Sequence, residues 1–317
     1  MPRCLANQDF IKERDQRMAK TKAMKIKRSP GDQFVQVLIY LFVGLFALIT
    51  LLPFVYVVAG SFATERELTE RAFFLFPHTI SFNAYQYIFK TGDAINGLKN
   101  SVLVTAVGVF INMALSCTLA YPLSRPYFKG RTFFTNMVIV TMLFSGGMVP
   151  TYLIVSNVLK LRDTFWALWL PAAINPFNMI IIKNYYQGLP MELEEAARID
   201  GCNDAQIFAK IIMPLSKPVL ASVSLFYAVS HWNSYFDAMM YISDKNKEVI
   251  QIVLRRIIFL TSAVTSDSGF DWGAFGTPPE KAVKMATTVV ATVPILLIYP
   301  FIQKYFTQGV MVGSVKG

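Results

Sequence analysis

Long apolar segments alternate with short polar ones along most of the chain. Six segments have the length that a membrane-crossing helix needs, about 20 residues at a rise of 1.5 Å per residue. We expect spans at residues 34–59, 101–121, 132–156, 165–182, 219–236 and 283–301. The pattern therefore predicts an all-α, polytopic membrane protein.

Two of these spans contain residues that interrupt helices. The third holds Gly146, Gly147 and Pro150 toward its outer end, and the fourth holds Pro171 and Pro176. Proline frees backbone carbonyls, which inside a bilayer must lie against protein or water. We therefore expect the third span to be bent or unwound and the fourth to be broken, although the glycines also fit close helix packing.

The charge distribution predicts how the spans are oriented. Charged residues make up 16% of the chain, against about 25% in soluble domains. The formal net charge is +10, and nine of the 30 lysines and arginines precede Gln33. Basic residues favour the cytoplasmic side, so residues 1–33 are expected to form a cytoplasmic arm. Arg125, Lys129 and Arg131 agree, and both termini are then inside. Because this arm adjoins apolar segments and has few aromatic residues between its charges, we do not expect it to bind nucleic acid.

One further apolar segment, residues 249–264, carries Arg255 and Arg256 at its centre. Each arginine would cost about 2.5–3.5 kcal/mol in the middle of a bilayer. We therefore expect an amphipathic helix on the outer surface, within an extracellular loop of residues 237–282. Its arginines would contact a partner protein or attract anions.

The remaining residue types offer no catalytic chemistry. Cys4, Cys117 and Cys202 lack C-x-x-C spacing, and the two histidines, His78 and His231, are far apart, so we expect no metal site. No G-x-x-x-x-G-K-[ST] phosphate loop occurs, so any ATP hydrolysis must come from another chain. No cluster of nucleophile and base marks an enzyme, and no catalytic residue is expected.

The most informative polar segment, residues 188–214, lies on the inner side between the fourth and fifth spans. Helix-favouring residues follow Pro190, and Gly201 is placed to end that helix. A second short helix is expected at residues 205–212, before Pro214 interrupts it. Two short helices joined at a glycine form an elbow. A partner that holds this elbow would tilt the spans on either side of it.

The same segment carries a motif made of Glu195, Ala196, Ala197, Gly201, Ile211, Met213 and Pro214. Its spacing resembles the EAA motif of binding-protein-dependent ABC importer permeases, EAA-x3-G-x9-I-x-L-P, with methionine in place of the usual leucine. The resemblance runs from about Phe34 to the C-terminus. Residues 144–157, 165–178, 232–236 and 313–317 are similar to carbohydrate-uptake permeases. Within that group, the chain resembles the maltose-importer inner subunit, and more closely the branch for oligosaccharides from complex polysaccharides.

This resemblance implies a type I importer permease fold of six transmembrane helices over residues 34–308, in a bacterial inner (cytoplasmic) membrane. In that family two related permeases form the pore, and two ATPase subunits bind the EAA loops. An extracellular solute-binding protein delivers the sugar. The chain itself would bind no cofactor, because ATP and Mg²⁺ are used by the ATPase subunits.

The resemblance also assigns roles by position. ATPase coupling falls to Glu195, Ala196, Ala197, Asp200, Gly201, Ile211 and Pro214. The tail of residues 309–317 would reach between the ATPase subunits, through Gly313, Ser314, Val315, Lys316 and Gly317. Taken alone, the glutamate also fits a solvated carboxylate at a helix start, and the tail also fits a frayed terminus.

A sugar path needs planar faces for C–H bonds and hydrogen-bonding partners for hydroxyls. The candidates in or beside the spans are Asn112, Asn175, Asn178, Trp232, Asn233 and Tyr235. The aromatic residues also fit an interfacial belt, and the first asparagine also fits a hydrogen bond between helices.

The leading hypothesis is thus a permease subunit of an ATP-driven oligosaccharide importer. A permease for another solute remains an alternative. So does an ion-coupled secondary transporter, which would need ionisable groups inside the spans, where the sequence places almost none.

Overall fold

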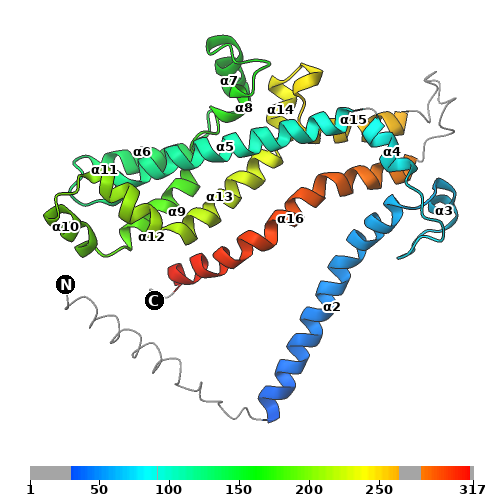
Figure 1. Ribbon diagram of the computed structural model, residues 1–317, viewed down its shortest axis with the longest axis horizontal. Coiled ribbons are helices and arrows are strands. Elements are labelled where there is room, and N and C mark those ends of the chain that lie inside the picture. Colours follow the sequence, from blue (N-terminus) through cyan, green and yellow to red (C-terminus); the bar gives the residue numbers. More distant parts are fainter. Residues whose placement is uncertain (1–29, 91, 264–279, 315–317) are drawn as a thin grey trace, which may run out of the picture. The chain divides into compact units, whose positions relative to one another are not determined.

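The computed structural model describes residues 30–90, 92–263 and 280–314, and helices account for most of them (Figure 1). The longer helices are α2 (Pro30–Ser61), α5 (Asp93–Ser124), α6 (Arg131–Leu143), α9 (Pro176–Gln187), α13 (Lys217–Trp232), α15 (Ile250–Ala263) and α16 (Glu280–Ser314). Shorter ones are α3 (Glu65–Glu70), α4 (Asn83–Lys90), α7 (Met148–Leu153), η1 (Ile154–Val158), α8 (Trp166–Trp169), α10 (Glu192–Ile199), α11 (Asp204–Ile207), η2 (Phe208–Ile212), α12 (Met213–Leu215), α14 (Tyr235–Tyr241) and η3 (Lys245–Lys247). Nearly all of the expected basic arm lies outside the described residues.

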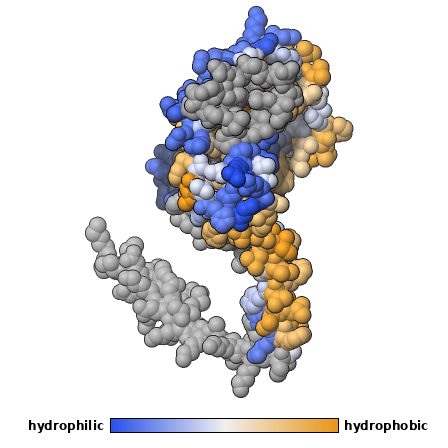
Figure 2. Space-filling model, turned by 90° about the vertical axis from the view of Figure 1, so that its right-hand side faces the viewer, coloured by the Kyte–Doolittle hydropathy of each residue, from blue (hydrophilic) through white to orange (hydrophobic). Residues whose placement is uncertain are grey.

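The chain divides into two compact units, residues 1–55 and 56–317. In the first unit, the large apolar side chains of α2 between Phe34 and Phe54 are 41–70% exposed. Figure 2 shows the hydrophobic surface of this helix. A long helix that is apolar on all sides is typical of a membrane span, because lipid can cover every face.

Three described helical segments are long and apolar enough to cross a membrane, at residues 31–61, 93–124 and 281–298. Two bent pairs qualify when each is taken as one span, residues 131–158 with a bend of 110° and residues 204–232 with a bend of 82°. The fourth expected span, residues 165–182, is divided between α8 and α9, and each is too short to span alone. The described part of the chain therefore contains up to five candidate spans, and the sixth stays a prediction.

The expected interruption of the third span is confirmed. α6 ends at Leu143, the chain bends, and α7 begins at Met148. Gly147, directly before α7, has φ +84°, a left-handed conformation that residues with a Cβ rarely adopt. The glycine therefore permits a change of direction that a continuous helix could not make.

The expected break in the fourth span is also present. α8 ends at Trp169 and α9 begins at Pro176, where a proline fits because the first helical residue needs no N–H donor. Asn175 caps α9 by accepting a hydrogen bond from the backbone N–H of Asn178 at 3.1 Å. Together, the proline and the cap explain why the helix restarts at this point.

α5 lies at the centre of the second unit and packs against α9, α13 and α15. Its buried positions recur every three or four residues, and most are small: Ala94, Gly97, Ser101, Val104, Gly108, Asn112, Ser116 and Ala120. Small residues let helices approach closely in membranes. At Gly108 the approach is so close that an added Cβ would lie 2.5 Å from Nε2 of His231.

The two ends of α5 carry different parts of the second unit (Figure 1). α10 to α12 lie near its C-terminal end, and α4 and α15 lie near its N-terminal end. With 32 residues, α5 is about 48 Å long. Hydrophilic residues gather at the end of this unit that faces the viewer in Figure 2, which carries α3 and α4.

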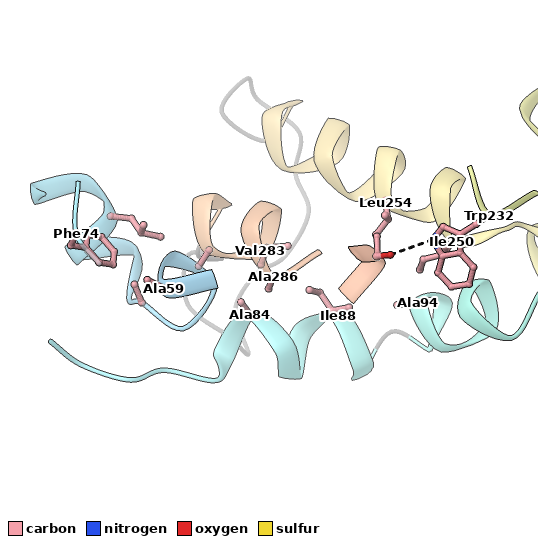
Figure 3. Packing of buried hydrophobic residues seen from close by; sticks show 14 residues of the cluster. Ala59, Phe74, Ala84, Ile88, Ala94, Trp232, Ile250, Leu254, Val283 and Ala286 are labelled. Carbon is pink, nitrogen blue, oxygen red and sulfur yellow. Dashed lines mark hydrogen bonds between the residues drawn. The ribbon is translucent and has the colours of Figure 1, made fainter. Parts of the chain in front are cut away.

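α15 matches the expected helix of residues 249–264 in position. It packs against α5 and α16, and it is not among the candidate spans of the described residues. Three hydrophobic clusters hold the second unit together, and Figure 3 shows the one in which Leu254 and Ile250 of α15 meet Ala94 of α5. α15 is therefore fixed against the end of the bundle.

Candidate functional site

The polar segment between α9 and α13 folds as an elbow. Its first helix, α10, ends at Ile199, and Gly201 follows with φ +82°. The backbone N–H of Cys202 reaches back to the carbonyl of Ala197 at 2.9 Å, which closes the turn. The predicted helix end at Gly201 is confirmed, because only a residue without a Cβ adopts this backbone conformation at little cost.

The second half of the elbow is more irregular than the single helix expected at residues 205–212. It consists of α11, the π-helical turn η2 and α12. Asn203 and Gln206 form a capping box at its start, with side-chain to backbone hydrogen bonds of 2.8 and 3.0 Å. Sequence reasoning missed this box, although the N-x-x-Q spacing is a known helix-start signal.

Pro214 does not stop the second half of the elbow where the sequence analysis expected. The chain remains helical through Leu215, and the bend of 82° comes at Ser216. The proline occupies the start of α12, where a missing N–H donor costs little. The elbow therefore meets α13 at a sharp corner.

One face of α10 is open to the surroundings. Glu195, Ala196 and Asp200 are exposed, as is Gly201 in the turn. Among the described residues of the second unit, Ile199 is the most exposed large apolar side chain, at 86%. The side chain of Ile199 offers apolar area that a docked protein would bury. Sequence reasoning did not single out Ile199.

The opposite face of α10 is anchored to the ends of α5 and α9. Glu194 forms an ion pair with Arg125, which directly follows α5, and the two side chains are only 2% and 1% exposed. Nη1 of Arg125 also donates a hydrogen bond of 2.8 Å to the carbonyl of Tyr186 in α9. The guanidinium lies over the ring of Tyr121, 5.3 Å from its centroid. A movement of α10 must therefore displace α5 and α9.

From the sequence, Arg125 indicates only the orientation of the spans, and only Glu195 of the neighbouring glutamates was given a coupling role. The structure separates them, with Glu194 buried against the bundle and Glu195 exposed. Ala197 of the motif is also buried, together with Ile207 and Ile212 in the same cluster. Only part of the motif is therefore available to a partner, and the rest holds the elbow in place.

The remaining coupling candidates lie in the second half of the elbow or toward residue 317. Ile211 is half-buried and Pro214 is exposed. The backbone of α16 includes Gly313 and Ser314, whereas residues 315–317 lie outside the described part. The predicted role of the tail stays a prediction.

The side chain of Asn112, one of the sugar-path candidates, forms its hydrogen bonds with other residues of the chain. Its amide nitrogen donates to the carbonyls of Ala172 and Ala173 in the break before α9, with 3.0 Å to the second. Its oxygen is 2.6 Å from Nε2 of His231, so the histidine donates this hydrogen bond. This asparagine, 1% exposed, satisfies the carbonyls that the broken span frees.

Asn175 and Asn178 line a cavity of about 530 Å³ together with Tyr227, Ser230 and His231. The hydroxyl of Tyr227 accepts a hydrogen bond from the backbone N–H of Asn175 at 3.1 Å and bonds Ser116 at 2.7 Å. Within the described residues, no three His, Cys, Asp or Glu side chains gather as a metal site requires. The lining combines these polar groups with apolar side chains, among them Ile174, Phe177 and Phe226.

The other candidates lie at the end of α13 away from the elbow, or directly after it. Trp232 is buried and donates a hydrogen bond of 3.3 Å to the carbonyl of Ala291 (Figure 3). Asn233 and Tyr235 line a second cavity, of about 440 Å³, beside Arg255. The structure thus brings two of the candidate residues together with an arginine of α15.

Comparisons with known proteins agree over most of the chain. The family described as "Binding-protein-dependent transport system inner membrane component" matches residues 22–312. Protein LplC of Bacillus subtilis is 51% identical over 277 residues, 87% of this chain and 93% of its own. The polygalacturonan/rhamnogalacturonan transport system permease protein YtcP of Bacillus subtilis is 50% identical over 286 residues, 90% and 99% of the two chains.

A solved structure also matches. It is the crystal structure of a bacterial ABC transporter involved in the import of the acidic polysaccharide alginate. One of its chains superposes with a TM-score of 0.80 and 33% sequence identity, covering 88% of this chain and 99% of that one.

Proposed function

Because this chain belongs to the binding-protein-dependent transport inner-membrane components, the permease subunits of ABC importers, we propose that it forms part of an oligosaccharide path driven by partner ATPases. One relative is named for transport of polygalacturonan and rhamnogalacturonan, and the matching solved structure is described as an importer of alginate. Both names support a saccharide as the solute. Family membership also favours ATP-driven import over the ion-coupled alternative. A second permease subunit, two ATPase subunits and an extracellular solute-binding protein complete the proposed importer.

The two-sided elbow carries this proposal. Its open face presents Glu195, Ala196 and Ile199, while its inner face is tied to the bundle by the buried pair of Glu194 and Arg125. An ATPase subunit that binds the open face would move α10, and the ion pair would pass that movement to α5. In this arrangement the elbow is cytoplasmic, both termini are inside, and α15 lies on the outer side of a bacterial cytoplasmic membrane.

The test separates docking from folding by changing only exposed side chains. Glu195→Lys and Ile199→Asp should abolish uptake of labelled oligogalacturonides in a deletion strain complemented with the variant gene. Both should also prevent co-purification of the ATPase subunits, while membrane levels of the permease stay normal. Glu70→Lys is the control, because it makes the same charge change on α3, where Glu70 is 60% exposed.

Normal uptake and normal ATPase co-purification in both variants would overturn the coupling role. Uptake by the reconstituted wild-type importer that continues without ATP, on an ion gradient alone, would overturn ATP-driven transport itself.

A further inference from the structure

The cavity beside Arg255 has a mixed lining. It lies between the end of α13, α15 and α16, and its polar residues are Asn233, Tyr235, Gln251, Arg255, Thr288 and Thr292. Leu254 and Ala291 also line it, and both belong to the hydrophobic cluster that contains Trp232 (Figure 3). Its volume of about 440 Å³ lies within the range of small-molecule sites. An apolar base with polar groups around it is suited to an amphipathic ligand such as a sugar.

Two adjacent arginines of α15 differ in their partners. Arg256 pairs with Asp93 at 3.1 Å and with Glu248 at 2.8 Å, which joins α15 to the start of α5. Arg255 forms no ion pair with any carboxylate of the described residues. Its guanidinium lies over the rings of Tyr235 and Phe259, 4.8 and 5.0 Å from their centroids. One arginine is therefore structural, and the other presents an uncompensated charge to the cavity.

The chemistry of Arg255 suits a carboxylate. A guanidinium is planar and always charged, and its parallel N–H donors match the two oxygens of a carboxylate. The aromatic contacts hold it without neutralising it, because ring faces attract cations weakly. An anion that enters the cavity would therefore pair with Arg255 without displacing a carboxylate of the described residues.

The neighbouring side chains suit sugar hydroxyls. The hydroxyls of Thr288 and Thr292 donate to carbonyls of their own helix at 2.9 and 2.7 Å, which leaves their oxygens as acceptors. The amide nitrogen of Asn233 donates to the carbonyl of Val229 at 2.9 Å, which leaves its oxygen as an acceptor too. Several acceptors beside one cation match the hydroxyls and the single carboxylate of a uronic acid.

We propose that this cavity is an entry subsite of the importer, where Arg255 binds the carboxylate of a uronic acid unit in an acidic oligosaccharide. The inference rests on the proposed function, since it takes the elbow as cytoplasmic. Arg256, the neighbour of Arg255 on α15, pairs with the first residue of α5, whereas Glu194 is paired just beyond the last one. α15 therefore lies at the end of α5 opposite the elbow, the end at which a solute-binding protein would deliver its ligand.

The experiment measures binding to the purified importer complex without its solute-binding protein. The probes are trigalacturonate and its fully methyl-esterified form, which has the same hydroxyls and no charge. Arg255→Gln should raise the Kd for trigalacturonate roughly 10-fold or more and leave the Kd for the ester unchanged. Arg255→Lys should give an intermediate loss. Arg66→Gln, at an 86% exposed arginine of α3, should change neither Kd.

Three results would overturn the subsite. One is a wild-type complex that does not bind trigalacturonate, another is a Kd unaffected by Arg255→Gln, and the third is an equal loss for both probes, which would indicate a structural role. Uptake of oligogalacturonides by the same wild-type complex, with its binding protein restored, tests the proposed function separately. If uptake persists while the subsite fails, only this inference is lost.

Discussion

The buried pair of Arg125 and Glu194 allows a quantitative test of how the elbow is held. Replacing Arg125 with methionine leaves the carboxylate of Glu194 buried and unpaired. Among the described residues, neither of its oxygens accepts a hydrogen bond from another group. With exposures of 1% and 2%, water cannot replace the lost partner. We expect Arg125→Met to lower the free energy of unfolding by about 3–5 kcal/mol.

Removing Glu194 instead of Arg125 should lower the free energy of unfolding by less. In Glu194→Met, Arg125 keeps its hydrogen bond to the carbonyl of Tyr186 and its contact with the ring of Tyr121. The double variant Arg125→Met/Glu194→Met buries no charge at this position, and replacing a whole buried pair with apolar residues is often neutral. The double variant should therefore be more stable than Arg125→Met alone, by about 2 kcal/mol or more.

The assay is unfolding of the detergent-purified importer complex, combined with uptake measurements on the same variants. The matched control is the exposed pair of Arg198 and Asp204 on the same elbow, 3.0 Å apart with exposures of 40% and 64%. Breaking that pair should cost no more than about 1 kcal/mol. The reasoning fails if Arg125→Met falls within the range of this control, or if the two single losses simply add in the double variant.

Two further predictions concern the turn of the elbow and the loop between η1 and α8. Gly201→Ala should lower stability by about 1–2 kcal/mol, because φ is +82° and nothing within 4 Å would clash with the new Cβ. Gly201→Asn should cost less, and equal losses in thermal unfolding would contradict this explanation. The backbone N–H groups of Ser243 and Asp244 donate hydrogen bonds to the carboxylate of Asp163, and these bonds lower its pKa. Its ionised form therefore stabilises the fold above the unfolded pKa of about 3.9, and this contribution is lost as pH falls through the depressed folded pKa. The difference in melting temperature between wild type and Asp163→Asn should be constant above about pH 5 and shrink below about pH 4, and a difference that grows toward acid would refute it.

Several features could be predicted because they depend on residues close together in the chain. The interruption after Leu143 follows from glycine and proline, and the restart of the helix at Pro176 follows from the proline itself. The turn at Gly201 follows from a glycine placed at the end of a helical segment. The predicted interruption at Pro214 was wrong by a few residues, because the π-helical turn η2 and the proline at the start of α12 keep the chain helical through Leu215.

The role of Asn112 could not be decided from local pattern. Its position inside a span was consistent with a sugar contact and also with a hydrogen bond between helices. The structure pairs it with carbonyls 60 and 61 residues away and with His231. Such a pairing depends on which face of α5 meets the break before α9, and no spacing within either segment contains that information.

By itself, the sequence determined the membrane class, the polar elbow and its motif, since each depends on hydrophobic length, turn chemistry or short-range spacing. Only the tertiary structure decided which charged residues are structural and which are available. Adjacent helical residues point about 100° apart, so Glu194 and Glu195, like Arg255 and Arg256, meet different surroundings. Their partners come from distant segments, as in the bond between Arg256 and Asp93, 163 residues apart. Packing between helices, which sets these partners, therefore assigned the roles of these charges.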